Sequence, residues 1–197
     1  MNEPLQFLPM VLALAAGIGV AAACGLRAFL PLLILGIAGR LGYAELHPGV
    51  HWLSSNPALL ALGVATVLEV LADKVPVVDH ALDGIATFLR PAAGFLASFA
   101  LLARWPEPWG PFLALVLGSG TLALHALKSK VRLGSTLTTL GIGNPVLSVL
   151  EDFTVAGLVI AAVLVPLLML LVLIAIMVFL LRRRPREAPR PEGDLPA

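Results

Sequence analysis

Charged residues are scarce in this 197-residue sequence, and cysteine is nearly absent. Only 13% of the residues are charged and 59% are hydrophobic, whereas ordinary soluble domains are about 25% charged. The mean hydropathy is +0.97. A single cysteine, Cys24, excludes an internal disulfide and a multi-cysteine metal site. This composition argues against a soluble domain and predicts an integral membrane protein.

Long apolar runs without ten-residue alternation predict helices rather than strands. We therefore expect an all-α, polytopic bundle of about seven spans, because each spanning helix needs about 20 mostly apolar residues. The predicted spans lie near residues 5–23, 27–41, 57–73, 91–104, 111–127, 146–165 and 167–183. They form a single transmembrane domain over residues 1–184, followed by a disordered tail at 185–197.

Lysine and arginine are distributed unevenly between the predicted loops. They are absent from 43–57 and 105–110, whereas five arginines follow the last span within residues 182–190. Because positive residues favour the cytoplasmic side, we expect the C-terminus, the Arg27 turn and the segments 74–90 and 128–145 to face the cytoplasm. Nucleic-acid binding does not follow from this basic tail, since such clusters are common topology anchors.

Two polar segments, 69–91 and 125–152, interrupt the apolar sequence. The spans beginning at residues 27 and 91 are short, so we expect broken or re-entrant helical pieces before them, and prolines and glycines supply the breaks. The two segments also align weakly, which predicts parallel repeats over about 57–104 and 111–165 or reflects chance in a Leu/Ala/Val-rich chain. A stripe of small residues from Gly17 to Ala23 suggests a homodimer contact.

Charges inside a bilayer are expensive, so they usually pair or line a cavity. We expect the two polar segments to lie close together. Their polar residues fall into two predicted classes. The predicted substrate-binding residues are Arg27, Lys74, Arg90, Lys128, Lys130, Arg132, Ser135, Thr138, Thr139 and Asn144. The predicted coupling or ion-pair residues are Glu69, Asp73, Asp79, Asp83, His125, Glu151 and Asp152.

Three phrases give a resemblance to a known family. They are 25-GLRAFLPLLILGIAGRLG-42, 69-EVLADKVPVVDHALDGIATFLRPAAG-94 and 135-STLTTLGIGNPVLSVLED-152. In this order and spacing they resemble the bacterial multi-spanning membrane proteins called domain of unknown function 4126, over residues 10–183. The resemblance implies a protein of the bacterial cytoplasmic membrane. It also implies that the following residues form one unit: Arg27, Glu69, Asp73, Lys74, Asp79, Asp83, Arg90, Lys128, Asn144, Glu151 and Asp152. It supplies no chemistry.

Three functions remain open at this stage. The leading hypothesis is a secondary transporter or flippase-like protein without a cofactor, which would move an anionic or zwitterionic solute or lipid head group through a cytoplasm-facing polar cavity. An integral membrane enzyme for a lipid phosphate is an alternative, with Mg²⁺ at Asp79 and Asp83. The third is an accessory membrane protein whose charges form an ion-pair scaffold.

Overall fold

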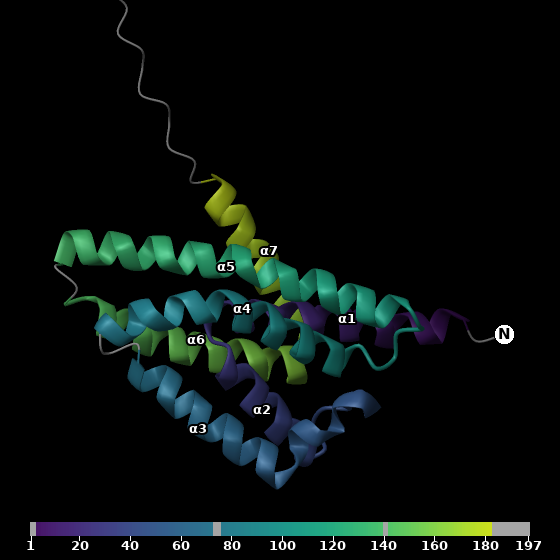
Figure 1. The fold of residues 1–197 in the computed structure, drawn as a ribbon. Helices are drawn as coiled ribbons and strands as arrows, with labels where there is room; N and C mark the ends of the chain where they lie inside the picture. Colours follow the sequence, from purple (N-terminus) through teal and green to yellow (C-terminus); the bar gives the residue numbers. More distant parts are fainter. Residues whose placement is uncertain (1–2, 73–75, 140–141, 183–197) are drawn as a thin grey trace, which may run out of the picture.

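The computed structural model describes residues 3–72, 76–139 and 142–182. The described residues are 87% helical and contain no strand, which confirms the all-α prediction. The elements are α1 (Glu3–Leu26), α2 (Phe29–Arg40), the short 3₁₀ helix η1 (Pro48–Ser54), α3 (Asn56–Ala72), α4 (Pro76–Leu101), α5 (Trp109–Thr139), α6 (Asn144–Leu164) and α7 (Pro166–Arg182) (Figure 1).

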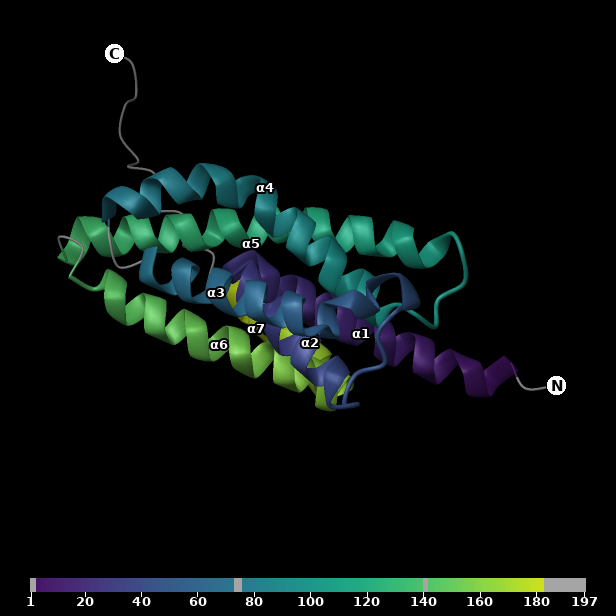
Figure 2. The same ribbon diagram turned by 60° about the horizontal axis from the view of Figure 1, so that its bottom comes forward.

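Helix α1 is the central element of the bundle and contacts α2, α4, α5, α6 and α7. Helices α4 and α5 lie side by side in both views, while α2 and α3 flank the bundle on one side (Figures 1 and 2). Small residues allow this close packing: a Cβ on Gly118 of α5 would lie 2.7 Å from the Pro91 carbonyl oxygen of α4. The core includes fully buried Val20, Leu35 and Val159.

Helix α1 ends inside the bundle rather than at its edge. A Cβ on Gly25 would lie 2.7 Å from the Cβ of Leu124, the middle residue of the 31-residue helix α5. At 1.5 Å per residue α5 is about 46 Å long, so the α1–α2 turn lies roughly 22 Å from either end of α5. The turn is thus packed in the interior of the bundle, and Arg27 is 0% exposed. The expected cytoplasmic side of the Arg27 turn stays a prediction.

The described helices include three that are long and apolar enough to cross a membrane: Phe7–Leu26 within α1, then α5 and α6. A fourth is reached if η1 and α3, bent by 66° at their junction, count as one span. These helices indicate a membrane-embedded protein, but the predicted count of seven spans is not confirmed. Helix α2 has only 12 residues, about 18 Å, well short of a hydrocarbon core of about 30 Å.

Two predicted helix breaks are wrong. Helix α4 continues through Pro91, although the sequence suggested that a new helix begins there; neighbouring groups can satisfy the carbonyl that a proline leaves free, so prolines are tolerated in membrane helices. Helix α5 continues past residue 127 to Thr139 and includes Gly134. An interior glycine costs only about 1 kcal/mol, too little to end a packed helix. The chain instead breaks just before Pro145, near the start of α6.

The predicted internal repeat is not confirmed. Its alignment equates Arg90 and Pro91 with Asn144 and Pro145, yet the first pair lies inside α4 and the second pair begins α6. The small-residue stripe from Gly17 to Ala23 does not form an exposed dimer face, because most of it is buried and Gly17 packs near Leu102 and Leu117. A homodimer thus stays a prediction, and this stripe does not supply its contact surface.

Candidate functional site: an ion-pair cluster at a helix break

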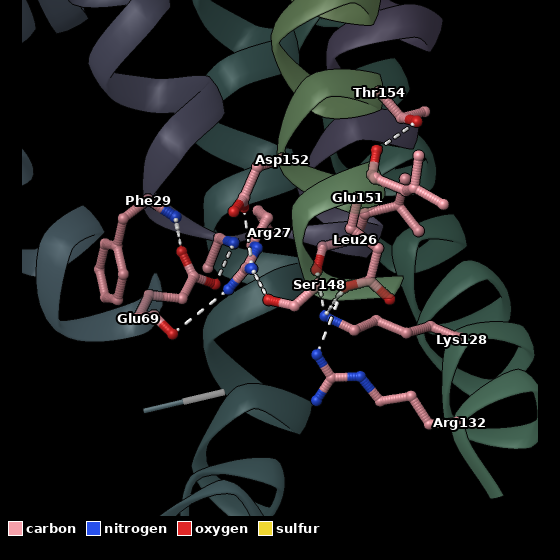
Figure 3. A network of polar contacts seen from close by, with 12 residues as sticks. Leu26, Arg27, Phe29, Glu69, Lys128, Arg132, Ser148, Glu151, Asp152 and Thr154 are labelled. Carbon is pink, nitrogen blue, oxygen red and sulfur yellow. Dashed lines mark hydrogen bonds and ion pairs between the residues drawn. The ribbon is translucent and has the colours of Figure 1, made fainter. Parts of the chain in front are cut away.

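Arg27 lies at the centre of the polar cluster, in the turn between α1 and α2 (Figure 3). One terminal nitrogen, Nη2, is 2.8 Å from Oδ1 of Asp152 and donates to the Ser148 hydroxyl at 2.9 Å. The other, Nη1, donates to the Glu69 carbonyl at 3.2 Å. Arginine keeps its charge in proteins, so a side chain with no exposure must be held by such partners. These contacts connect the turn to α6 and α3.

The Glu69 carboxylate binds the beginning of α2. Its Oε1 accepts the backbone N–H of Ala28 at 2.8 Å, and its Oε2 accepts that of Phe29 at 3.1 Å. The first N–H groups of a helix have no partner within the helix, and a negative charge there is favourable. Ala28 cannot cap α2 with its own side chain. Glu69 therefore supplies from α3 the cap that the local sequence lacks.

Lys128 from α5 binds the other side of the same break. Its Nζ donates to the Leu26 carbonyl at 3.0 Å, at the C-terminal end of α1, where a cation is favourable. The same Nζ is 2.8 Å from Oε2 of Glu151, and Nη2 of Arg132 is 3.5 Å from that oxygen. All three side chains are largely buried, at 3%, 16% and 11% exposure respectively. This second group connects α1, α5 and α6.

Regular helical spacing places these side chains on shared faces. Ser148, Glu151 and Asp152 follow the spacing i, i+3, i+4 on α6, and Lys128 and Arg132 follow i, i+4 on α5. We call these five residues, with Arg27 and Glu69, the break cluster. The sequence could not indicate that the clustered charges also bind backbone groups of residues 26, 28 and 29. Ser148 was absent from the predicted site residues, and its helical spacing to Asp152 was the available signal.

The other predicted site residues fall outside the break cluster. Asn144 and Thr139 stabilise the turn after α5: the Asn144 amide donates to the Thr136 hydroxyl at 3.0 Å, and Thr139 accepts the Gly143 N–H at 3.0 Å. Hydroxyls of Thr138 and Thr139 donate to carbonyls one helical turn back, at Gly134 and Ser135. These contacts are local, so they do not themselves form a binding cavity.

The remaining predicted residues have varied environments. Lys130 is exposed, His125 is partly buried, and Arg90 is 4% exposed on α4. Asp73 and Lys74 lie outside the described residues, and so do the side chains of Asp79 and Asp83. The Mg²⁺ alternative therefore stays a prediction. Among the residues that could be searched, no group of three His, Cys, Asp or Glu side chains could hold a metal ion.

A groove opens beside the break cluster, between α5 and α6. It has a volume of about 230 Å³, and Lys128 and Glu151 form its polar wall. The other lining residues are Leu26, Leu124, Leu127, Val131, Leu147, Leu150 and Thr154. This groove is mainly apolar, which differs from the predicted polar cavity. Because Leu127 is 44% exposed and Leu150 is 56% exposed, the groove is reachable from the outer surface of the helix pair.

Comparison with known proteins gives a family. No curated protein and no solved structure matches this chain. The sequence does match the family described as "Domain of unknown function (DUF4126)" over residues 14–186, which include every helix that forms the break cluster. The chain therefore belongs to the DUF4126 family.

Proposed function

We propose that this protein is a small secondary transporter or flippase-like protein of the bacterial cytoplasmic membrane, with several spans and a cytoplasmic C-terminus. Its substrate is an anionic or zwitterionic amphiphile such as a lipid, which reaches the protein sideways through the groove between α5 and α6. The single observation that carries the proposal is the position of a buried Lys128–Glu151 pair in the wall of an otherwise apolar groove.

The groove combines the two surfaces that an amphiphile needs. Leu124, Leu127, Leu147 and Leu150 offer an apolar lining to an alkyl chain. The Lys128 ammonium offers a charge-assisted hydrogen bond to a phosphate or carboxylate oxygen. A ligand pocket of this type is mostly apolar with a few convergent polar groups. A small polar solute would make few contacts with this apolar lining, so an amphiphile fits the groove better.

The Lys128–Glu151 pair also suggests how the substrate is exchanged. A head-group oxygen that binds Lys128 competes with Glu151 for the same ammonium, 2.8 Å away. Protonation of Glu151 would weaken its pairing with Lys128 and favour the substrate. Glu151 would then bind a proton together with the head group, the coupling role that we expected for the carboxylates of this segment.

A structural scaffold is the second candidate, and one observation favours it. Arg27 has no exposed surface and holds three elements together through Glu69, Ser148 and Asp152. Such a network stabilises the fold without any substrate. The scaffold and the transporter differ in the groove, because only the transporter requires the groove to be open.

A lipid-scrambling assay in proteoliposomes separates the two candidates. A phospholipid with a fluorescent head group is incorporated, and a membrane-impermeant reductant bleaches the label on each lipid that reaches the outer leaflet. Filling the groove with Leu150→Trp should reduce the rate at least tenfold, whereas Leu122→Trp, an exposed position of α5 outside the groove, should leave it unchanged. Lys128→Ala should reduce the rate while the protein still elutes as a folded species. The proposal fails if the parent protein moves no lipid, or if both tryptophan variants are equally active.

A further inference from the structure

A second cavity lies at the opposite end of the bundle from the α5–α6 turn. Its volume is about 350 Å³, within the range of small-molecule sites. It is an open cavity lined by the first half of α1, the loop after α2, the end of α4 and the α6–α7 junction. Its lining is mainly apolar and includes Leu12, Ala13, Leu101, Ala162 and Val163. It shares no lining residue with the groove between α5 and α6.

The polar part of this cavity is an exposed ion pair. Nη2 of Arg104, just after α4, lies 2.5 Å from Oε2 of Glu45, in the loop after α2. The side chains are 56% and 68% exposed, and both residues line the cavity. Exposed pairs of this kind contribute little to stability. Exchange of these partners for the charges of a ligand would therefore disturb the fold little.

We propose that this second cavity binds a zwitterionic amphiphile, with the alkyl chain in the apolar part of the cavity and a phosphate ester and an ammonium group at the Arg104–Glu45 pair. The ligand phosphate would replace Glu45 at the Arg104 guanidinium, and the ligand ammonium would replace Arg104 at the Glu45 carboxylate. A purely anionic head group would leave Glu45 without a cationic partner, and its negative charge would repel the Glu45 carboxylate. The charge pattern at the rim therefore selects a zwitterion over an anion. This site is separate from the groove of the proposed function, and each can fail without the other.

Trp105 provides a reporter for this site. It follows Arg104 in the sequence, and its indole nitrogen donates to the Met10 carbonyl at 3.0 Å, between the lining residues Pro9 and Leu12 of α1. The full-length protein with Trp52→Phe and Trp109→Phe keeps Trp105 as its single tryptophan. Bromine quenches tryptophan fluorescence at contact distances, so an alkyl chain brominated at its end reports entry into the cavity.

The experiment titrates this protein in maltoside micelles with bromododecyl phosphocholine, and with bromododecyl sulfate as the anionic comparison. We expect saturable quenching by the phosphocholine at mole fractions at which the sulfate has little effect. Ala13→Phe, which fills the cavity, should abolish the saturable part, whereas Ala123→Phe, an exposed position on α5, should retain it. Arg104→Ala should weaken phosphocholine binding about tenfold, the loss expected for one charge-assisted hydrogen bond.

Glu45→Ala tests the selection of head group separately. It should remove the preference for phosphocholine over sulfate, because the carboxylate that repels the anion is gone. Quenching that rises linearly and is equal in Ala13→Phe and Ala123→Phe would show ordinary micelle contact and overturn the site. Saturable quenching with no preference between the two head groups in the parent protein would overturn the assignment of a zwitterion.

Discussion

Substitution of Arg27 by methionine tests whether the break cluster holds the fold together. Methionine keeps much of the side-chain volume and removes the charge. The change leaves the Asp152 carboxylate without its 2.8 Å partner and the Ser148 hydroxyl without its donor. Removing one partner of a buried pair costs about 3–5 kcal/mol, because the other charge stays buried. Asp152 retains 26% exposure, so we expect the lower value, about 3 kcal/mol.

For a chain of this length, 1 kcal/mol corresponds to a shift in Tm of about 2–4 °C, so Arg27→Met should melt about 6–12 °C below the parent protein. Thermal unfolding in detergent, followed by tryptophan fluorescence, measures this shift. Arg104→Met is the matched control, since it breaks an arginine–carboxylate pair whose side chains are more than half exposed. Exposed pairs contribute about 0–1 kcal/mol, so the control should lie within about 4 °C of the parent.

A second substitution distinguishes an uncompensated charge from lost packing. In Arg27→Met combined with Asp152→Leu, the pair is replaced by apolar groups, and such replacements are often neutral or stabilising. The double variant should therefore recover most of the lost Tm, which is a non-additive result. A single variant as stable as the parent, or a double variant less stable than the single one, would refute the electrostatic account.

Three further results are expected. Gly118→Ala should destabilise the protein by about 1–3 kcal/mol in a denaturation assay, because its Cβ would lie 2.7 Å from a backbone oxygen of α4, whereas Gly120→Ala meets open space and should be neutral or slightly stabilising. Glu69→Ala should lower the free energy of unfolding by about 0.5–2 kcal/mol, the usual loss for a helix cap. A larger loss would mean that Glu69 does more than cap α2. A cysteine introduced at Ser55 should react with a membrane-impermeant maleimide only from outside the cell. Reaction only from inside would reverse the proposed orientation. The native Cys24 is buried and should not react.

The sequence predicted the helical class and the convergence of several charges for a physical reason. Apolar runs of span length dictate helices in a membrane. Buried charges must find partners, which explains why residues as distant as Arg27 and Asp152 come together. Whether these residues bind a substrate stays a prediction, because their contacts with one another do not reveal a ligand.

The positions of the helix breaks were less predictable. Proline is the usual signal for a break, but Pro91 lies within α4, packed against Gly118 of α5. A helix ends where its packing partners and caps favour an end, and those partners are distant in sequence. The break after Leu26 depends on Glu69 and Lys128, which supply an anion and a cation to its two sides. The sequence predicted a break between residues 23 and 27 from the length of a span, and α1 does end at Leu26. No local pattern in residues 24–29 indicates the two distant side chains that bind it.

This dependence links the proposed substrate site to the centre of the bundle. The break exposes a partial negative charge at the end of α1 and a partial positive charge at the start of α2. Lys128 neutralises the first while it also binds Glu151, so a head group that draws the ammonium into the groove would weaken its hydrogen bond to the Leu26 carbonyl. Under the proposed function, substrate binding and the geometry of the α1–α2 turn are therefore coupled through one nitrogen atom. Glu69, on the other side of the turn, would hold α2 in place while α1 responds.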